Sequence, residues 1–468
     1  MSQSLFLFDI LNEQKKHYQN NSAPSLSHRI EKLNLLKNAV LKHQQSLLKA
    51  LSADYGYRSE NESLISEIVP LINQINYTLK KLKKWIKPQR REAGLMLLPA
   101  KVEVHYQPLG VVGIIVPWNF PVLLALSPLV SIMAAGNNAM IKMSEFTPQT
   151  NKVIKKLLNS VFSDNHVAVI EGDADIGAKF SELAFDHLLF TGSTEIGCKI
   201  MAAAANNLTP VTLELGGKSP VLIAQDMPID VAVERMIYGK CLNAGQICVA
   251  PDYVLCHESQ VEAFIDSYQQ QFKKMYADVV NNGDYSNIIN ERQFNRIQAL
   301  IDDAVEKGAK IHSALEDDIA KNHRKLATQL MTNVTDDMKV MQQEIFGPLL
   351  PIVSYQTLSE AIDYINQRSR PLSLYLMSFD KRVHNQIIEH THSGGVCINE
   401  SVKHVIVDDA PFGGIGLSGM GAYHGKEGFL RFSHAKTVLT RGKLNTSKLM
   451  HPPYGKWWQA LFFKIFIR

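Results

Sequence analysis

The chain has 468 residues, and at roughly 150 residues per domain this length predicts about three domains. Hydrophobic residues make up 46% and charged residues 20%, a balance typical of folded globular proteins that excludes a disordered chain, a collagen-like repeat and a multi-span membrane protein. The net charge of +4 is too small for this length to indicate a nucleic-acid partner.

The cysteine content and the first residues predict a cytoplasmic protein. Five Cys are too few, and odd in number, for a disulfide scaffold, which favours a reducing compartment. The segment from Met1 to Ile10 carries an Asp and lacks a basic region, so no signal peptide is expected. The end of the chain is unusual, because residues 456–468 are mostly apolar and hold two of the four Trp.

Two helices are predicted in the first ninety residues. Over residues 26–54 apolar side chains recur at helical spacing, and Ser27 can cap the helix. Over residues 62–86 the same period continues through the run Lys80-Lys-Leu-Lys-Lys-Trp85. That run is either a basic binding patch or a solvated helix face, and the unbroken apolar period favours the solvated face.

Strands begin near residue 94. The stretch 94–107 alternates apolar and polar residues and predicts a strand or hairpin, and the apolar run 110–116 ends at a Pro, as expected of a buried parallel strand. Strands then alternate with helices to about residue 400, which predicts an α/β fold of doubly wound sheets in two lobes that meet near residue 215. Further strands are expected at 139–142, 167–170, 187–190 and 220–223.

Cys248 is the candidate nucleophile. It lies in Asn243-Ala-Gly-Gln-Ile-Cys248-Val-Ala-Pro251, whose small and turn-forming residues predict a loop that exposes the thiol. The alternative is a small buried hydrophobe, the usual role of a free Cys. Without C-x-x-C spacing or a His cluster, no metal site is expected. The other cysteines have apolar or helical neighbours and are expected in the core: Cys198, Cys241, Cys256 and Cys397.

A carboxylate and an amide lie at two further strand ends. Glu214 stands between two Leu just before a Gly pair, where burial would raise its pKa toward that of a general base; otherwise it is a strand-terminal carboxylate in water. Asn119 stands between Pro117 and Pro121, where a rigid amide could stabilise an oxyanion; otherwise it caps the following helix.

A further group of residues could bind a cofactor. Gly192 and Ser193 follow an apolar strand and open a helix, an arrangement that suits a pyrophosphate, although the spacing is not the G-x-G-x-x-G fingerprint. Lys142 and Glu145 end another strand and could hold ribose hydroxyls, or they could be surface residues.

Together these stretches resemble the aldehyde dehydrogenase family over about residues 95–440. The short chain, Ala250-Pro-Asp-Tyr253 and a late Pro-Pro-Tyr resemble its class 3 branch, and within that branch the bacterial coniferyl aldehyde dehydrogenases. The resemblance rests on seven motifs in the family's order: Pro117-Trp-Asn-Phe-Pro121, Ile141-Lys-Met-Ser-Glu145, Phe190-Thr-Gly-Ser-Thr194, Leu213-Glu-Leu-Gly-Gly-Lys-Ser-Pro220, Gly245-Gln-Ile-Cys248, Gln343-Glu-Ile-Phe-Gly-Pro348 and Pro411-Phe-Gly-Gly-Ile-Gly-Leu-Ser-Gly419.

The resemblance implies a domain organisation with two Rossmann-type lobes and a small β arm. The implied segments are an NAD(P)-binding domain of residues 1–93 and 108–214 with part of 400–430, a catalytic domain of residues 215–399, an oligomerisation arm of residues 94–107 and 431–445, and an apolar, basic tail of residues 446–468.

The resemblance also implies a role for each candidate residue. Cys248 would attack the aldehyde carbonyl, Asn119 and the Cys248 backbone N–H would hold the oxyanion, and Glu214 would activate the water that hydrolyses the thioester. The implied cofactor contacts are Lys142 and Glu145 at the adenosine ribose, Gly192 and Ser193 at the pyrophosphate, Glu344 at the nicotinamide ribose, Phe346 near the nicotinamide, and Trp118.

The implied activity is NAD(P)-dependent oxidation of coniferyl or another aromatic aldehyde to its acid. Glu145 favours NAD, since a carboxylate near the 2′ position repels the phosphate of NADP, although class 3 relatives often accept both. The alternatives are a medium- or long-chain fatty aldehyde as substrate, a coenzyme A-acylating dehydrogenase, against which Glu214 argues, and a non-catalytic binding protein on the same scaffold.

Two further expectations concern association. By resemblance, the 94–107 hairpin and a strand at 433–441 would pair two subunits, which predicts a homodimer. The tail from Lys456 has an apolar core of about a dozen residues, too short to span a bilayer. It could form an interfacial helix at a membrane, or it could pack on its own or the partner subunit.

Overall fold

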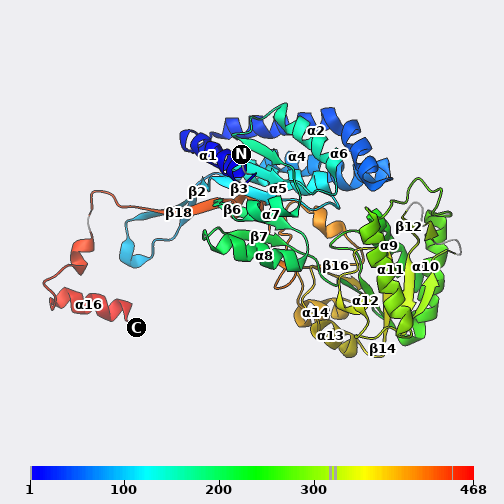
Figure 1. Cartoon of the computed structure of the whole chain (residues 1–468). Helices are drawn as coiled ribbons and strands as arrows, with labels where there is room; N and C mark the ends of the chain where they lie inside the picture. The colour runs from blue at the N-terminus through cyan, green and yellow to red at the C-terminus, as the bar shows by residue number, and fades with distance from the viewer. Residues whose placement is uncertain (1–2, 316–318, 321–323, 445, 468) are drawn as a thin grey trace.

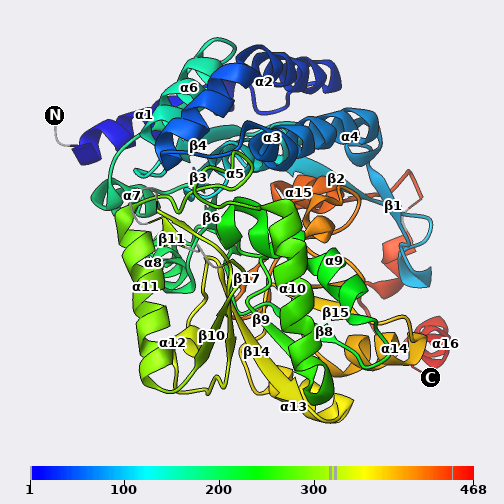
Figure 2. The same cartoon turned by 90° about the vertical axis from the view of Figure 1, so that its right-hand side faces the viewer.

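The computed structural model describes residues 3–315, 319–320, 324–444 and 446–467. The expected oligomerisation arm ends at residue 445 and the expected tail at residue 468, and both of these residues lie outside the described part. The structure has a body of two lobes, from which a β arm and a C-terminal helix project (Figure 1). Figure 2 shows the two lobes one above the other, with α2, α3 and α4 on the first lobe and α10 and α11 on the second.

The first lobe is built on a six-stranded sheet with the order β17-β7-β6-β3-β4-β5. Its neighbours pair in parallel except at β17, which is antiparallel to β7. The strands predicted at 110–116, 139–142, 167–170 and 187–190 are confirmed to within a residue. The strands are β3 (Val111–Ile115), β4 (Asn138–Lys142), β5 (Val167–Ile170), β6 (His187–Thr191), β7 (Val211–Glu214) and β17 (Gly419–Met420).

Helices cover both faces of this sheet, which explains why its strands are apolar throughout. Val112 and Ile114 pack under α2 (Leu26–Tyr55), α4 (Val69–Trp85), α5 (Pro121–Ala135), α6 (Pro148–Asn159) and α15 (Gly425–Arg431). Val111 packs on the other face under α1 (Gln3–Asn20), α7 (Ala174–Ser181) and α8 (Thr194–Ala205). Helix α1, which docks through the buried Leu7 and Leu11, was not predicted.

The two predicted N-terminal helices are present with changed ends. The cap of α2 is Ser25 and not Ser27, because the helix begins at Leu26 and the Ser25 hydroxyl accepts the His28 N–H at 3.2 Å. The second helix begins earlier, as α3 (Glu60–Ser63), and passes through a π turn, η1 (Leu64–Ile68), before α4. At its end Leu82 and Trp85 are buried while the lysines between them face solvent, as a solvated face requires.

The second lobe is built on a seven-stranded sheet with the order β10-β13-β14-β9-β8-β15-β16, in which β10 is antiparallel to its neighbour. It begins directly after β7, close to the join predicted near residue 215, and it confirms the strand at 220–223. Its strands are β8 (Pro220–Ile223), β9 (Tyr253–His257), β10 (Lys310–Ser313), β13 (Gln329–Thr332), β14 (Leu349–Tyr355), β15 (Ser373–Met377) and β16 (Gly395–Ile398); β11 (Ile319–Ala320) and β12 (Lys325–Leu326) form a separate pair.

Helices cover both faces of the second sheet as well. Val221 and Ile223 point to α9 (Ile229–Cys241) and α10 (Val261–Met275), and Leu222 points to the opposite face. The helices of that face are α11 (Glu291–Glu306), α12 (Lys339–Gln342), α13 (Leu358–Asn366) and α14 (Lys381–His390). Short 3₁₀ turns are η3 (Leu242–Gly245), η4 (Glu258–Gln260) and η6 (Lys403–Ile406).

The arm is a three-stranded antiparallel sheet in which β2 (Lys101–Pro108) lies between β1 (Gln89–Arg91) and β18 (Ser433–Thr440). The hairpin therefore starts earlier than predicted. Residues 94–98 are not a strand, because Gly94 has a φ of 73° and opens a 3₁₀ turn, η2 (Leu95–Leu97). The strand expected at 433–441 is confirmed.

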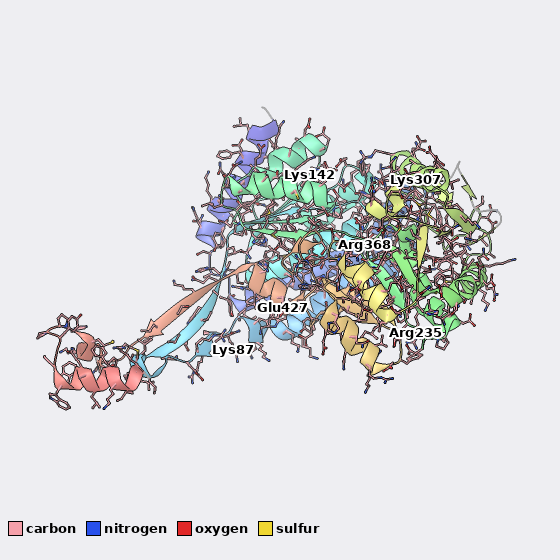
Figure 3. All side chains as sticks on the ribbon, turned by 90° about the horizontal axis from the view of Figure 1, so that it is seen from below. Lys87, Lys142, Arg235, Lys307, Arg368 and Glu427 are labelled. Carbon is pink, nitrogen blue, oxygen red and sulfur yellow. The ribbon has the colours of Figure 1, made fainter. Side chains whose placement is uncertain are left out.

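The tail beyond the arm contains η7 (Thr446–Met450) and α16 (Trp457–Phe466). Figure 1 shows α16 past the far end of the arm, away from both lobes, and Figure 3 shows its side chains spread around it. In the described part of the chain, the expected packing of the tail on the body of its own subunit is not found. No described helix is both long and apolar enough to cross a membrane.

Candidate active site

The candidate residues of the first lobe meet at one edge of its sheet. Because β3, β4, β6 and β7 run parallel, their carboxyl ends lie together, as at the binding edge of other doubly wound sheets. Asn119 follows β3, Lys142 ends β4, Ser193 follows β6 and Glu214 ends β7. The second lobe supplies the facing loop, which carries Cys248 between η3 and β9.

The loop before Cys248 has a strained backbone. Asn243 and Ala244 have φ values of 50° and 52°, in the left-handed region that side chains other than Gly rarely adopt. Gly245 has a φ of 75°, and a Cβ there would lie 2.5 Å from the carbonyl oxygen of Gly347. A glycine is therefore required at position 245, both because the backbone is in the left-handed region and because the loop that carries Gly347 approaches closely.

The buried side chain of Gln246 holds this loop in place. Its Nε2 donates to the carbonyls of Asn243 at 2.8 Å and Asn287 at 3.0 Å, and its Oε1 accepts from the Ile289 N–H at 3.0 Å. Beyond Cys248, the Tyr375 hydroxyl donates to the carbonyl of Val249. With these bonds the loop has little freedom to rearrange, which a preorganised site requires.

Cys248 is half-buried, with its thiol at the wall of an apolar pocket. Burial raises the pKa of the thiol well above its ordinary value, and the carboxyls of Glu344 and Glu214 raise it further. The backbone N–H groups of Cys248 and Val249 act in the opposite direction. Positive charge placed beside the thiol would lower this raised pKa and favour the thiolate.

The other cysteines divide into buried and accessible positions. Cys241 and Cys256 are in the core, as predicted, and Cys397 is partly buried. Cys198 is exposed, so its predicted core position is wrong: it lies on the outer face of α8. Among the described residues, no group of His, Cys, Asp and Glu is placed to hold a metal ion.

The Asn119 amide faces the Cys248 loop. Asn119 is 3% exposed, and its Nδ2 donates to the carbonyl of Gln246 at 3.2 Å. Its own carbonyl accepts from the Tyr55 hydroxyl at 2.9 Å, Arg58 at 3.0 Å and Asn243 at 3.2 Å. It does not cap the following helix, since α5 has no side-chain cap at its N-terminus and begins after Phe120. The alternative of a helix cap is thus excluded.

Glu214 is a buried carboxyl and not a strand end in water. It is 5% exposed, and neither carboxyl oxygen has a hydrogen-bond partner. Burial raises its pKa well above the ordinary 4.5, and the charge of Arg431 opposes this only in part. A carboxyl with free lone pairs and a raised pKa has the properties of a general base.

Glu344 follows α12 in the second lobe, and its carboxyl lies beside Gly216. Burial, with Asp252 adding to it, raises its pKa to about 8, and its Oε1 lacks a hydrogen-bond partner. A Cβ at Gly216 would lie 2.1 Å from its carboxyl, so the Gly pair after Glu214 makes room for it. Phe346 (φ 47°) meets Trp118 edge to face, with ring centroids 5.3 Å apart.

The remaining cofactor candidates line the first lobe. Lys142 is buried, donates to the Met143 carbonyl at 2.8 Å and lies 3.9 Å from the carboxylate of the exposed Glu145; Figure 3 places Lys142 on this lobe. Ser193 caps α8 by accepting the Ile196 N–H at 3.5 Å. A Cβ at the preceding Gly192 would lie 2.5 Å from the Phe190 ring. The unpartnered Glu344 carboxyl oxygen and the N-terminus of α8 are groups of the kind that bind the ribose and the pyrophosphate of a dinucleotide.

A pocket leads from Cys248 and Asn119 to the surface. Its wall is mainly apolar, with Ser66, Gln74 and Asp408 among its few polar members. Such a lining suits an apolar ligand oriented by a small number of polar contacts. The apolar side chains around it include Ile65, Phe120, Leu123, Leu124, Tyr238, Leu242, Ile247, Val249, Val402, Val405, Ile406, Phe412 and Tyr423.

Several residues of this site were not predicted. Tyr55, Arg58, Glu62 and Glu67 are buried behind Asn119, and the sequence motif around Cys248 assigns no role to the buried Gln246. The sequence contains only a weak indication of this buried cluster. Arg58 and Glu62 have the i, i+4 spacing of a helical ion pair, but such pairs are usually exposed.

The chain is similar to known proteins over most of its length. The model of the family described as "Aldehyde dehydrogenase family" matches residues 9–438. The probable coniferyl aldehyde dehydrogenase of Pseudomonas aeruginosa is 49% identical over 455 residues, which are 97% of this chain and 95% of that protein.

Two solved structures share the fold. The structure of Staphylococcus aureus AldH in a substrate-bound state has a TM-score of 0.93 and 37% identity, and covers 98% of this chain and 99% of its own. Betaine aldehyde dehydrogenase from the same organism, solved in complex with NAD+, has a TM-score of 0.84 and 26% identity, and covers 93% of this chain and 87% of its own.

Proposed function

The chain belongs to the aldehyde dehydrogenase family, and from this membership we propose that it uses NAD to oxidise an aromatic aldehyde of the coniferyl type to its carboxylic acid. One observation carries the proposal. Asn119 and Cys248 line one apolar pocket, and the buried Glu214 carboxyl is near enough to the thiol to raise its pKa. Nucleophile, oxyanion donor and base are thereby available to one substrate.

In the proposed reaction the Cys248 thiol gives its proton to solvent water, and the sulfur adds to the aldehyde carbon. The carbonyl oxygen becomes an oxyanion, to which the Asn119 Nδ2–H and the Cys248 backbone N–H donate. Because Asn119 is held through both its side chain and its carbonyl, little reorganisation is needed as the charge develops. When bound, NAD would accept the hydride, and its positive charge would favour the Cys248 thiolate. Loss of hydride from the carbon leaves a thioester on Cys248.

Glu214 completes the proposed reaction. It takes a proton from a water molecule whose oxygen attacks the thioester carbon. The C–S bond then breaks, the acid leaves, and the proton passes from Glu214 to the Cys248 sulfur. Its unpartnered oxygens are free to accept that proton. A base at this position favours hydrolysis over transfer to coenzyme A, and an intact set of Cys248, Asn119 and Glu214 argues against a non-catalytic scaffold protein.

We propose that the cofactor binds at the carboxyl edge of the first sheet. Lys142 and Glu145 would hold the adenosine ribose, and Gly192 and Ser193 the pyrophosphate at the start of α8. Glu344 has a carboxyl oxygen without a partner, which would accept hydrogen bonds from the nicotinamide-ribose hydroxyls. The rings of Trp118 and Phe346, which meet edge to face, would pack near the nicotinamide. The negative charge of Glu145 supports NAD over NADP.

The proposed substrate class follows from the pocket and from the relative. An apolar pocket accepts an aromatic ring and a conjugated chain, and the Pseudomonas aeruginosa relative is described as a probable coniferyl aldehyde dehydrogenase. A medium- or long-chain aliphatic aldehyde is the second candidate, because the same lining accepts it.

We also propose that the protein is a cytoplasmic homodimer that touches a membrane peripherally. Strand β18 is largely exposed along the arm, which is the expected pairing element. Trp457, Leu461 and Ile465 of α16 are at least half exposed, beside the cationic Lys456 and Lys464, as in an interfacial helix. The alternative occupant of that apolar surface is the partner subunit.

One screen tests the proposed function. The protein is mixed with NAD and with cinnamyl, benzyl and C6 to C16 aliphatic aldehydes, and NADH is followed by absorbance while the product is identified without coenzyme A. The proposal expects the highest kcat/KM for a cinnamyl-type aldehyde and free acid as the product. A preference for the aliphatic series would show that the substrate is an aliphatic and not an aromatic aldehyde. A requirement for coenzyme A would show that the reaction is acyl transfer and not hydrolysis.

A further inference from the structure

A buried cluster of charged residues lies directly behind the proposed oxyanion donor. Arg58 is fully buried; its Nη1 donates to the Asn119 carbonyl at 3.0 Å and lies 2.9 Å from the carboxylate of Glu67. The guanidinium also lies over the rings of Tyr55 and Phe120, 5.0 and 4.7 Å from their centroids. Arg58 therefore holds the backbone of the residue whose amide faces the catalytic loop.

Glu67 fixes the other side of the same turn. Its Oε2 accepts the backbone N–H of Val122 at 2.8 Å and of Leu123 at 3.0 Å, in the first turn of α5. This helix has no side-chain cap within its own segment, so a carboxylate from another helix satisfies its free N–H groups. The turn that carries Asn119 is thus held at both ends by one ion pair.

Glu62 extends the cluster to the second lobe. Its carboxylate accepts the backbone N–H of Asn243 at 3.0 Å and the hydroxyl of Ser286 at 2.7 Å, and it lies 3.9 Å from Arg58. Asn243 opens the strained loop before the nucleophile, and its Nδ2 donates to the Tyr55 hydroxyl at 3.3 Å. The cluster of Tyr55, Arg58, Glu62 and Glu67 therefore contacts both loops that would hold the oxyanion.

The π turn η1 makes this cluster geometrically possible. In a regular α-helix, residues five apart, such as Glu62 and Glu67, point about 140° away from each other. The wider π turn over Leu64–Ile68 brings both carboxylates toward Arg58. A buried group of one cation and two carboxylates contributes little to stability compared with well-packed apolar residues, so a structural role alone is a poor explanation for it.

We propose that Tyr55, Arg58, Glu62 and Glu67 are positioning residues for the dehydrogenase reaction. They hold the Asn119 amide and the Cys248 loop at a fixed separation, so that the oxyanion formed on thiol addition meets both donors. None of the four lines the substrate pocket, so they act through Asn119 and Asn243. The inference rests on the proposed function and adds to it the residues that set the geometry of its first chemical step.

The test compares variants that change one atom or group. Tyr55→Phe removes only the hydroxyl that donates to the Asn119 carbonyl, and Glu67→Gln keeps the shape but removes the charge. Tyr355→Phe is the matched control, because that buried hydroxyl also donates to a carbonyl, of Ile223 at 2.7 Å, but does so in the second sheet. Each variant is assayed for the pre-steady-state NADH burst, for kcat, and for the KM of NAD and of the aldehyde.

The inference expects Tyr55→Phe and Glu67→Gln to slow the burst and kcat about 10- to 100-fold, as misplacement of an oxyanion donor does. The KM of NAD should stay within about threefold, because binding is not the step affected. Tyr355→Phe should keep the wild-type burst rate while losing a comparable amount of thermal stability. If Glu67→Gln does not fold, Tyr55→Phe decides alone.

A wild-type burst rate in Tyr55→Phe and Glu67→Gln, with melting temperatures lowered as in Tyr355→Phe, would overturn the inference and leave the cluster a purely structural one. Failure of the proposed function is seen separately. In that case the wild-type protein itself would show no NADH burst with any aldehyde of the screen, whatever the variants do.

Discussion

At the scale of single residues, the proposed reaction depends on Cys248, Glu214 and Asn119 and on the buried side chains that hold them in place. Glu214 ends a strand, Asn119 follows one and Cys248 lies in a loop of small residues, and their short motifs made all three candidates from the sequence. Arg58 lies between α2 and α3 and Glu67 lies in the π turn η1, and neither stands in a sequence motif that indicates a function. Their burial depends on the π turn and on contact with α5, neither of which leaves a pattern in the sequence.

Glu214→Gln should separate the two halves of the reaction. The NADH burst should remain, because thioester formation does not need this base, while the steady-state rate should fall by about 100-fold or more. Glu306→Gln, at an exposed position on α11, is the control. Rapid-mixing absorbance measures both phases. An unchanged steady-state rate would rule out Glu214 as the essential base.

The raised pKa of Glu214 also predicts a pH dependence. The carboxyl must be ionised to accept a proton, and burial keeps it protonated to a higher pH than an ordinary carboxyl of 4.5. Hydrolysis of the thioester should therefore slow as the pH falls through this raised pKa. The acid limb of kcat should lie above pH 4.5 in the wild type and vanish in Glu214→Gln.

At the scale of elements, periodicity predicted which segments are helices but not their ends. The apolar period of α2 is compatible with a cap at Ser25 or Ser27, and only the start of the helix decides between them. Helix α1 was not predicted, because Leu5, Phe6, Leu7 and Phe8 are consecutive apolar residues without a helical period, and only Leu7 among them is buried. The sheets themselves were predictable, since apolar strands alternate with helices.

The corrected cap can be tested directly. Ser25→Ala should remove about 1 kcal/mol of local helix stability, which corresponds to amide exchange about fivefold faster in the first turn of α2. Ser27→Ala lies inside that turn and is the matched control. Hydrogen–deuterium exchange with mass spectrometry on the N-terminal peptides measures both variants. Faster exchange in Ser27→Ala than in Ser25→Ala would place the cap at Ser27 after all.

At the scale of the whole molecule, the two sheets and the arm follow from local patterns, but the surroundings of the tail do not. The sequence of one chain does not indicate which partner covers an exposed apolar helix such as α16. The arm pairs residues more than three hundred positions apart, such as Val104 with Thr437, and projects from the first lobe (Figure 1). Its exposed strand β18 predicts association. Light scattering should therefore give the mass of a dimer, and a stable monomer would contradict that expectation.

The apolar tail predicts a measurable membrane interaction. Deleting residues 456–468 should reduce co-sedimentation with anionic liposomes, because the exposed apolar side chains and cations of α16 are removed together. The control is the same assay with neutral liposomes, together with the dimer mass of both proteins. Equal partitioning of the full-length and truncated proteins would exclude membrane contact, and loss of the dimer on truncation would assign the tail to the partner subunit.

The most direct measurement of the central claim is NAD reduction by Cys248→Ala with coniferyl aldehyde, beside the wild type and the Cys198→Ala control, whose thiol is exposed on α8. The account predicts turnover in the wild type and in Cys198→Ala, an acyl adduct on Cys248 detected by mass spectrometry after an acid quench, and no NADH from Cys248→Ala. Substantial NADH formation by Cys248→Ala would contradict the thioester mechanism.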